Sequence, residues 1–485
     1  MGNVQLTMAH KLGIIRKTKE EKEFMNKRND AIRDARTLGI PKMLLLGLQH
    51  MFAMFGATIL VPILVNGYFN GEGLSIQVTL FFAGVGTLFF HCCTKLKVPA
   101  FLGSSFAYLG GFYMVSQLDT GIFANMTMGE KLPYACGGIV VAGLMYLILA
   151  AIVKIVGVKR VMHFLPPIVT GPIIICIGLS LAPSAINNAS TNWLLAFVAL
   201  AVVVIFNIWG KGMFKIIPIL LAVVISYALA LVMNAMGMTN ADGSAILDFS
   251  GAAAASFVGI PDFVICKFDI TAILVMAPIA LASMMEHIGD ISAISATVGE
   301  DFIADPGLQR TLIGDGLATS LSAVFGGPAN TTYGENTGVL ELSRVHDPRV
   351  IRLAAVFAII LSFIPKMDEL IGSMPSAIVG GISFILYGMI SAIGVRNIVE
   401  NKVDFTKSRN LIIAAVILVC GLGFSDGITF SVAGTSITLT SLAIAAIAGI
   451  LLNAILPGND YEFGVNPKGD ISRGLGQNPQ NTDIE

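Results

Sequence analysis

The chain has 485 residues, of which 55% are hydrophobic and only 13% are charged. Its mean hydropathy is +0.80, whereas soluble globular proteins carry about 25% charged residues. These values exclude a soluble enzyme. At about 20 residues per membrane-spanning helix, a chain of this length has room for up to about 14 to 16 spans. The sequence therefore predicts an all-α polytopic membrane protein.

The charges and cysteines give no sign of a nucleic-acid partner or of a metal site. The net charge is −1, from 30 Lys and Arg against 31 Asp and Glu, and it gives no indication of a nucleic-acid partner. The six cysteines lie in or beside apolar stretches without the spacing of metal ligands or pairs, so we expect no metal and no cofactor. The polar N-terminal region lacks the apolar core and cleavage site of a signal peptide.

Apolar runs separated by polar residues, Gly or Pro predict fourteen membrane-spanning segments, seven on each side of a polar stretch at 237–269. The first seven lie near residues 42–66, 78–94, 101–117, 133–156, 164–182, 193–209 and 214–236. The second seven lie near residues 270–298, 311–325, 329–345, 350–364, 374–394, 410–424 and 437–456.

The positive charges set the expected orientation. With a cytoplasmic N-terminus, all but three of the 30 Lys and Arg residues fall on the cytoplasmic side, and those outside are Lys131, Lys267 and Lys366. We therefore expect a multi-pass protein of the cytoplasmic membrane with both termini in the cytoplasm. Each half contains an odd number of segments, so the halves have opposite orientations. This is the 7+7 inverted repeat of many secondary transporters.

The third segment of each half contains small, hydroxylated and helix-breaking residues, at 99–108 and at 326–336. Lipid cannot satisfy the N–H and C=O groups of extended backbone, so such backbone is buried in protein or lines a site. We interpret both segments as broken spans that pair as short strands and then open half-helices with inward N-termini. The alternative is that both are edges of ordinary loops.

Carboxylates at membrane depth are rare, and by default they mark a substrate or proton path. Glu286 and Asp290 are four residues apart, so a helix places both on one face, toward the same cavity. Because two poorly hydrated carboxylates disfavour each other's charge, one of them can hold a coupling proton. The alternative is a pair that only bonds the ends of neighbouring helices.

Other polar residues in the segments are further candidates or lie outside the site. Glu335 lies where an extended stretch becomes a helix, and there it can accept hydrogen bonds from the ring N–H groups of a ligand. For Glu335 the alternative is a helix cap without ligand contact. His50 and Asp315 either assist the carboxylates or bond neighbouring helices without such a role. Glu341 lies three residues before Arg344, and we expect a local ion pair outside the site.

Four stretches together resemble the nucleobase/ascorbate transporter family, also called nucleobase:cation symporters. They are QHMFAMFGATILVP at 49–62, GSSFA at 103–107, EHIGD at 286–290 and the stretch 326–344. The family signature, an acid, Gln or Pro followed by Asn-x-Gly, reads Glu335-Asn336-Thr337-Gly338 here. The resemblance covers residues 42–456, and within the family it is greatest to bacterial uracil permeases.

The resemblance implies fourteen spans in two domains, with short antiparallel strands in spans 3 and 10. The core domain would hold spans 1–4 (42–163) and 8–11 (270–365), and the gate domain spans 5–7 (164–236) and 12–14 (366–456). An extracellular linker (237–269) and cytoplasmic tails (1–41 and 457–485) would complete the chain. Members often dimerise through the gate domain, so a homodimer surrounded by membrane lipid is implied.

The resemblance also implies a substrate site formed by Glu286, Glu335, Phe106, Tyr333 and Gly334. The two glutamates would hydrogen-bond a pyrimidine ring, and backbone N–H groups of Phe106 and Gly334 would bind its carbonyls. We expect proton coupling from Glu286, Asp290, His50 and Asp315. Asp290 is a departure, because uracil permeases commonly have His there and Asp is more typical of purine carriers.

These expectations define a function. Two carboxylates and two backbone N–H groups complement the two donors and two acceptors of uracil in a cavity where unpaired groups are costly. We therefore expect a symporter that takes up uracil with a proton by alternating access, with substrate between broken spans 3 and 10 and span 8. A symporter for xanthine or another purine is the alternative. The acidic site disfavours an anion exchanger or channel, and the lack of a nucleophile with a base disfavours an enzyme.

Overall fold

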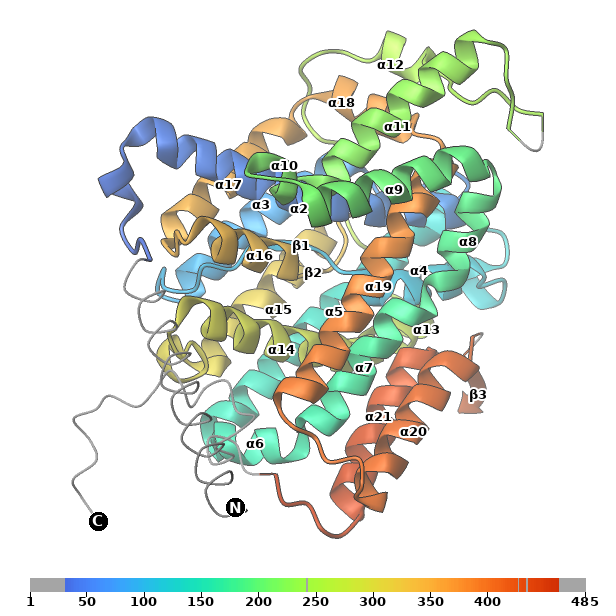
Figure 1. Cartoon of the computed structure of the whole chain (residues 1–485). Coiled ribbons are helices and arrows are strands. Elements are labelled where there is room, and N and C mark those ends of the chain that lie inside the picture. Colours follow the sequence, from blue (N-terminus) through green and yellow to red (C-terminus); the bar gives the residue numbers. More distant parts are fainter. Residues whose placement is uncertain (1–30, 241–242, 426, 433–434, 462–485) are drawn as a thin grey trace, which may run out of the picture.

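The structure is a computed structural model, and it describes residues 31–240, 243–425, 427–432 and 435–461. It is mostly helical (Figure 1). Within these residues, seven helical stretches are long and apolar enough to cross a membrane. An eighth is added if α17 (Pro348–Ser362) and α18 (Pro365–Gly372), which meet at 85°, form one span. The chain is therefore an integral membrane protein.

Helices lie at most of the segments that the sequence predicts. In the first half the main helices are α2 (Ile40–Tyr68), α3 (Ile76–Cys93), α4 (Leu109–Ser116), α5 (Met128–Val156), α7 (Pro167–Ser180), α9 (Trp193–Trp209) and α11 (Pro218–Ala235). In the second half they are α13 (Ile270–Met276), α14 (Ala280–Val298), α15 (Leu308–Val324), α16 (Gly334–Ser343), α17, α19 (Ser376–Glu400), α20 (Ser408–Gly423) and α21 (Ser441–Ile455).

Short helices connect or extend these elements. They are η1 (Ala35–Leu38), η2 (Phe106–Tyr108), η3 (Gly121–Phe123), α6 (Val158–Phe164), α8 (Ala182–Ser190), α10 (Met213–Ile216), α12 (Ser250–Ala254), η4 (Ala277–Ile279), the π-helix η5 (Ile303–Gly307) and α18. Helix α8, which the sequence analysis did not predict, continues the chain directly beyond α7. Helix α12 lies within the linker that was expected to be polar.

Side-chain caps explain where several helices begin. Ser75 precedes α3, Asn192 precedes α9, and Asp347 precedes α17, and each accepts a hydrogen bond from a backbone N–H of the first turn. Thr127 and Glu130 form a reciprocal capping box at the start of α5. These side chains satisfy N–H groups that have no acceptor inside the helix.

The two broken spans meet in a short sheet. Strands β1 (Leu102–Ser104) and β2 (Asn330–Thr332) are antiparallel, with Leu102 opposite Thr332 and Ser104 opposite Asn330. Side chains complete their hydrogen bonding: Thr87 Oγ1 accepts from the N–H of Leu102 at 2.8 Å, and Thr319 Oγ1 donates to the carbonyl of Asn330 at 2.9 Å. Figure 1 shows this sheet near the middle of the molecule, where α2, α3, α14 and α15 pack against it.

A second hairpin was not predicted. Strands β3 (Ile428–Val432) and β4 (Thr435–Leu439) pair antiparallel between α20 and α21. The sequence analysis began the last segment at residue 437, but the helix begins at Ser441, where Thr440 caps it. Residues 428–440 are rich in Thr and Ile, which favour strands although their hydropathy resembles that of a span.

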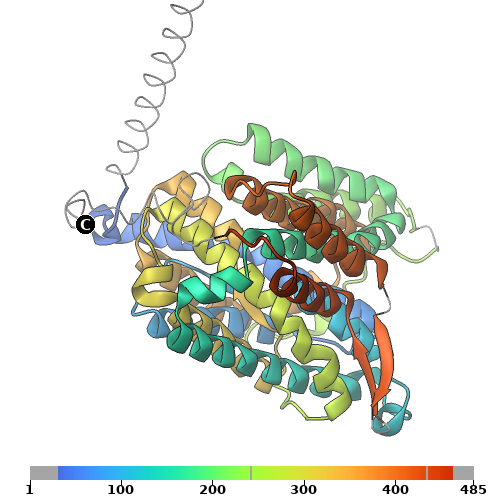
Figure 2. The ribbon, with the colours of Figure 1, turned by 90° about the horizontal axis from the view of Figure 1, so that it is seen from below.

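The helices pack in two groups. In the first group, α15 packs on α5 and α3, and α17 packs on α2 and α3. In the second group, α19 packs on α7, α8 and α9, α9 packs on α11, and α20 packs on α7 and α21. Helix α14 crosses between them, because it contacts α5 and α15 on one side and α7 and α21 on the other. Figure 2 shows the green and red helices of the second group on the same side of the molecule.

Glycine permits the closest packing in the first group. A Cβ atom added at Gly143 of α5 would lie 2.5 Å from the carbonyl oxygen of Gly316 and 2.9 Å from the N atom of Ser320, both on α15. Real Cβ atoms do not approach backbone atoms this closely, so a larger residue would push α5 and α15 apart.

Candidate functional site

A small pocket lies where the strand pair, α14, α16, α7 and α19 meet. It encloses about 30 Å³ and is lined by Phe106, Ile174, Glu286, Asp290, Thr331, Thr332, Tyr333, Gly334, Glu335, Ile390 and Ile393. We call it the central pocket. The structure thus brings together all five residues expected to bind the substrate. It also places Asp290 beside Glu286 in the pocket wall, as their spacing on one helix predicts.

The central pocket offers both acceptors and donors. Glu286 and Glu335 supply carboxylate oxygens, and Oε2 of Glu286 is buried without a hydrogen-bond partner among the described residues. Phe106 and Gly334 are the first residues of η2 and α16. The first N–H groups of a helix have no acceptor within that helix. The pocket can therefore bind a planar ligand that has both N–H groups and carbonyls.

Hydrogen bonds hold the walls of the central pocket in place. Thr332 Oγ1 donates to Asp290 Oδ2 at 2.9 Å and so joins β2 to α14. The hydroxyl of Tyr333 donates to the carbonyl of Ser104 at 2.8 Å, and Ser104 Oγ donates to the carbonyl of Thr58 on α2 at 2.8 Å. These hydrogen bonds tie both broken spans to their neighbours and help to fix the position of the two helix starts.

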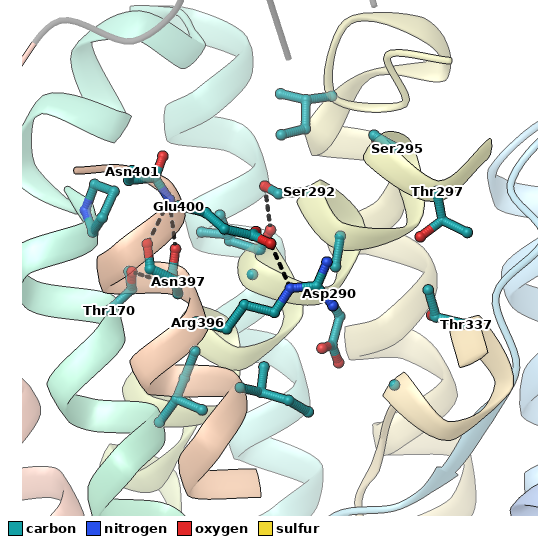
Figure 3. A pocket seen from close by; sticks show the side chains of 18 of the residues that line it. Thr170, Asp290, Ser292, Ser295, Thr297, Thr337, Arg396, Asn397, Glu400 and Asn401 are labelled. Carbon is teal, nitrogen blue, oxygen red and sulfur yellow. Dashed lines mark hydrogen bonds and ion pairs between the residues drawn. The ribbon is translucent and has the colours of Figure 1, made fainter. Parts of the chain in front are cut away.

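A larger cavity, drawn in Figure 3, shares lining residues with the central pocket. It has a volume of about 180 Å³, and Ile174, Asp290, Gly334 and Ile393 line both spaces. We call it the Arg396 cavity after the cation on its wall. Its other polar lining residues are Thr170, Ser292, Ser295, Thr297, Thr337, Glu341, Arg396, Asn397, Glu400 and Asn401.

The polar residues of α19 in the Arg396 cavity are bonded to one another and to α7. Arg396 Nε donates to Glu400 Oε1 at 2.5 Å, and Asn397 Nδ2 donates to Thr170 Oγ1 at 2.8 Å (Figure 3). Sequence reasoning missed Arg396, although an arginine so close to the end of an apolar segment was a usable signal. Glu341, which the sequence analysis placed outside the substrate site, lines this cavity and not the central pocket.

A third and larger cavity, of about 750 Å³, lies next to Phe106. We call it the Tyr113 cavity, and its walls include Tyr68, Phe106, Tyr113, Ser180, Asn187, Val379 and Ser441. Phe106 lines this cavity and the central pocket alike, and its ring packs edge-on against Tyr387 of α19, with centroids 6.0 Å apart. Sequence reasoning missed Tyr387, which looks like an ordinary apolar position of its span. The central pocket therefore lies between two wider spaces.

His50 and Asp315 lie outside the central pocket. Asn336 Nδ2 donates to the carbonyl of His50 at 3.0 Å, so the observed partner of His50 is the residue after Glu335. Asp315 is completely buried on α15, and its Oδ2 lies 3.4 Å from Nδ1 of His287. Within the described part of the chain, no group of three or more His, Cys, Asp or Glu residues could hold a metal ion.

Solved structures with a similar fold are membrane transporters. The transmembrane domain of the cyanobacterial bicarbonate transporter BicA is 14% identical, covers 87% of this chain and 99% of its own, and has a TM-score of 0.56. The overall structure of SLC26A9 is 13% identical, covers 85% of this chain and 64% of its own, and has a TM-score of 0.59. At these identities the likeness concerns the fold alone. A helical membrane protein with a polar pocket between broken spans is the class that the structure defines.

The sequence comparisons name the family. Residues 41–430 match the family described as Permease family (Xan_ur_permease). The uracil permease of Bacillus caldolyticus is 41% identical over 449 residues, which are 90% of this chain and 96% of the relative. The uracil permease of Escherichia coli (strain K12) is 35% identical over 421 residues, 84% of this chain and 90% of the relative. The chain belongs to this permease family, which confirms the resemblance, and it is a transporter.

Proposed function

We propose that this permease takes up uracil together with a proton. The observation that supports this most directly is the composition of the central pocket, where Glu286 and Glu335 face the helix starts at Phe106 and Gly334. Uracil has two ring N–H donors and two carbonyl acceptors, and these match the two carboxylates and the two free backbone N–H groups. Curated relatives that match over most of this chain are named uracil permease.

Selectivity would follow from the cost of unpaired polar groups. In a dry pocket, a ligand that lacks one of the four groups leaves a carboxylate or an N–H without a partner, which costs about 1–3 kcal/mol. The Tyr333 hydroxyl is already bonded to the Ser104 carbonyl, so the Tyr333 side chain adds shape and apolar contact. A carboxylate at Glu335, instead of an amide, favours a ligand that presents N–H donors on that side.

The proton would bind to the carboxylates of α14. Glu286 and Asp290 line one pocket, and two ionised carboxylates beside a neutral ligand would leave uncompensated buried charge. One proton on this pair lowers that charge from −2 to −1, so proton and uracil binding favour each other by the same factor. His50 would assist this proton binding through its hydrogen bond with Asn336, the residue after Glu335. Asp315 would assist it from α15.

The two helix groups would be the core and gate domains of an alternating-access transporter. The core comprises residues 42–163 and 270–365, the gate comprises 164–236 and 366–456, and fourteen crossings complete the inverted repeat. The position of the central pocket between the Arg396 cavity and the Tyr113 cavity supports this arrangement. Rocking of one group against the other would widen one cavity while closing the other.

The Arg396 cavity would face the cytoplasm. Ile32, one of the first described residues, forms a β-bridge with Val345. Val345 lies in a loop that holds three of the expected cytoplasmic cations. The last described residues pack on another such loop, where Asn459 donates to the carbonyl of His163 at 3.0 Å. These contacts support two cytoplasmic termini in the cytoplasmic membrane.

Exposed apolar residues on the gate helix α9, among them Phe197 and Trp209, would contact lipid or the gate of a second copy.

The second candidate substrate is xanthine or another purine. Asp290 favours it, because the acid at that position resembles purine carriers. Thr332 fixes Asp290 at the edge of the central pocket, where the second ring of a purine would extend toward the Arg396 cavity. Competition between the two bases therefore separates the candidates.

The test is uptake of labelled uracil by vesicles that contain the purified protein, with and without an inward proton gradient. We expect saturable accumulation that requires the gradient and that excess unlabelled uracil abolishes, while equal xanthine leaves most of it. Glu341→Gln is a matched control for Glu335→Gln, because Glu341 lines only the Arg396 cavity. Stronger competition by xanthine than by uracil would reverse the substrate assignment, and accumulation that follows sodium instead of the proton gradient would refute proton coupling.

A further inference from the structure

A second polar pair lies behind the central pocket. Nδ1 of His287 on α14 lies 3.4 Å from Oδ2 of Asp315 on α15, and both side chains are 0% exposed. Apart from this contact, neither ring nitrogen of His287 nor either oxygen of Asp315 has a hydrogen-bond partner among the described residues. Buried polar groups normally have partners, so a pair with this much unused capacity requires an explanation.

Aromatic residues pack against the pair, and the pair lines none of the three cavities. The rings of Phe90 on α3 and Tyr146 on α5 pack edge-on against His287, with centroids 6.3 Å and 6.5 Å away. The hydroxyl of Tyr146 donates to Ser283 Oγ at 2.8 Å. Neither His287 nor Asp315 lines the central pocket, the Arg396 cavity or the Tyr113 cavity. Uracil in the central pocket could not touch this pair.

The pair nevertheless has a link to the pocket. Glu286 precedes His287 in the chain and lines the pocket, and its Oε2 and the hydroxyl of Tyr108 are buried without partners. Glu286 and His287 are neighbours on α14, so buried groups without hydrogen-bond partners among the described residues lie both in the pocket wall and in the enclosed pair.

We propose that His287 and Asp315 together form a second proton-binding site, which stores one transported proton away from the substrate and exchanges it with Glu286. With that proton the pair is neutral overall, either as imidazolium and carboxylate or as imidazole and carboxylic acid. Without it, a single uncompensated charge would remain in a dry site. In the transfer the pair loses one proton and the Glu286 carboxylate gains it. This inference rests on the proposed proton-coupled transport.

Among the described residues that face the pair, no other charge would neutralise Asp315. The titratable groups that face the pair are Glu286 and Asp290 on α14, Tyr146 on α5, Tyr108 on η2 and, through Phe90, His91 on α3. The two acids add negative charge, and neither tyrosine carries a positive one. His91 is already bonded through Nε2 to the carbonyl of Ala100 at 2.8 Å, so its ring has a structural partner that His287 lacks.

The experiment separates exchange of uracil from its accumulation in proteoliposomes. His287→Gln and Asp315→Asn roughly keep the shape of the side chains, but each leaves one titratable group alone, so that the proton is no longer shared by two groups. We expect both variants to retain uracil binding and uracil counterflow, which needs no net proton movement, and to lose accumulation driven by a pH gradient. In both variants, the uptake of protons that follows addition of uracil to the detergent-solubilised protein should also fall. A pH indicator measures this uptake.

His91→Gln is the matched control, because Gln can still donate to the Ala100 carbonyl and no carboxylate pairs with His91 there. It should accumulate uracil as the wild type does. Gradient-driven accumulation at the wild-type level in either His287→Gln or Asp315→Asn would overturn the proposal. So would an infrared difference spectrum of the wild type in which Asp315→Asn removes no uracil-dependent band. If the wild type itself shows no proton-dependent accumulation, the proposed function fails, and that result is seen before any variant is compared.

Discussion

The hydrogen bond between Thr332 and Asp290 gives a quantitative test of proton coupling. Thr332 Oγ1 donates to Asp290 Oδ2 at 2.9 Å, and both residues are buried. A buried hydrogen bond to a charged group contributes about 1.5–3 kcal/mol. Thr332→Val removes the donor and keeps the shape of the side chain. The bond stabilises the ionised carboxylate, so its loss favours the protonated form that the proposal assigns to the uracil-bound state.

One pH unit corresponds to about 1.4 kcal/mol of difference between two protonation states. The midpoint of uracil affinity against pH should therefore move upward by about 1 to 2 units in Thr332→Val, measured by equilibrium binding to the purified protein from pH 5 to 9. Thr331→Val is the control, because Thr331 also lines the pocket but its hydroxyl has no partner among the described residues. A midpoint in Thr332→Val that coincides with the control while uracil still binds would refute the assignment of the coupling proton to this cluster.

Three further outcomes are expected. Glu335→Gln should lower uracil uptake at least about tenfold, since the loss of a charge-assisted bond costs about 1.5–3 kcal/mol; unchanged uptake by correctly inserted protein would contradict it. Gly143→Ala, which places a Cβ 2.5 Å from the backbone of α15, should lower the free energy of unfolding by about 1–3 kcal/mol, seen as earlier thermal unfolding. The hydrogen bond from Arg36 lowers the pKa of Asp34 from 3.8 to about 2, so the stabilisation from this carboxylate is present above pH 3.8 and is lost as the pH falls toward 2. The difference in thermal midpoint between wild type and Asp34→Asn should be equal at pH 5 and pH 8, and a difference that shrinks at pH 5 would argue against this ion pair.

Much of the fold follows from local patterns in the sequence. The predicted segment 193–209 is helix α9, and the predicted segment 270–298 spans α13, η4 and α14. Apolar runs of this length leave few alternatives in a membrane, because a helix satisfies its own backbone. The breaks at β1 and β2 were visible for the same reason, since Gly, Ser, Pro and Asn at membrane depth are poor helix formers. Local chemistry also placed Glu286 and Asp290 on one face.

The parts that were missed depend on contacts between residues distant in the chain. The pairing of His287 with Asp315 joins two different helices. Arg396 reaches the Arg396 cavity only because α19 packs on α7. Tyr387 is one of many aromatic residues in apolar segments until its ring meets Phe106. The β3–β4 hairpin was missed because Thr and Ile suit both a strand and the start of a span. A single sequence has no signal that separates these cases.

The position of the central pocket follows from the joining of the two halves. Strand β1 comes from the first half and β2 from the second, and their pairing brings the start of η2 next to the start of α16. Neither strand alone would present both helix starts to one ligand, because β1 precedes η2 and β2 precedes α16. The carboxylate of Glu286 lies on α14, which packs on α5 of the first group and α7 of the second. Relative movement of the two groups would therefore change the surroundings of Glu286, the proposed proton carrier, in the same step that changes access to the ligand.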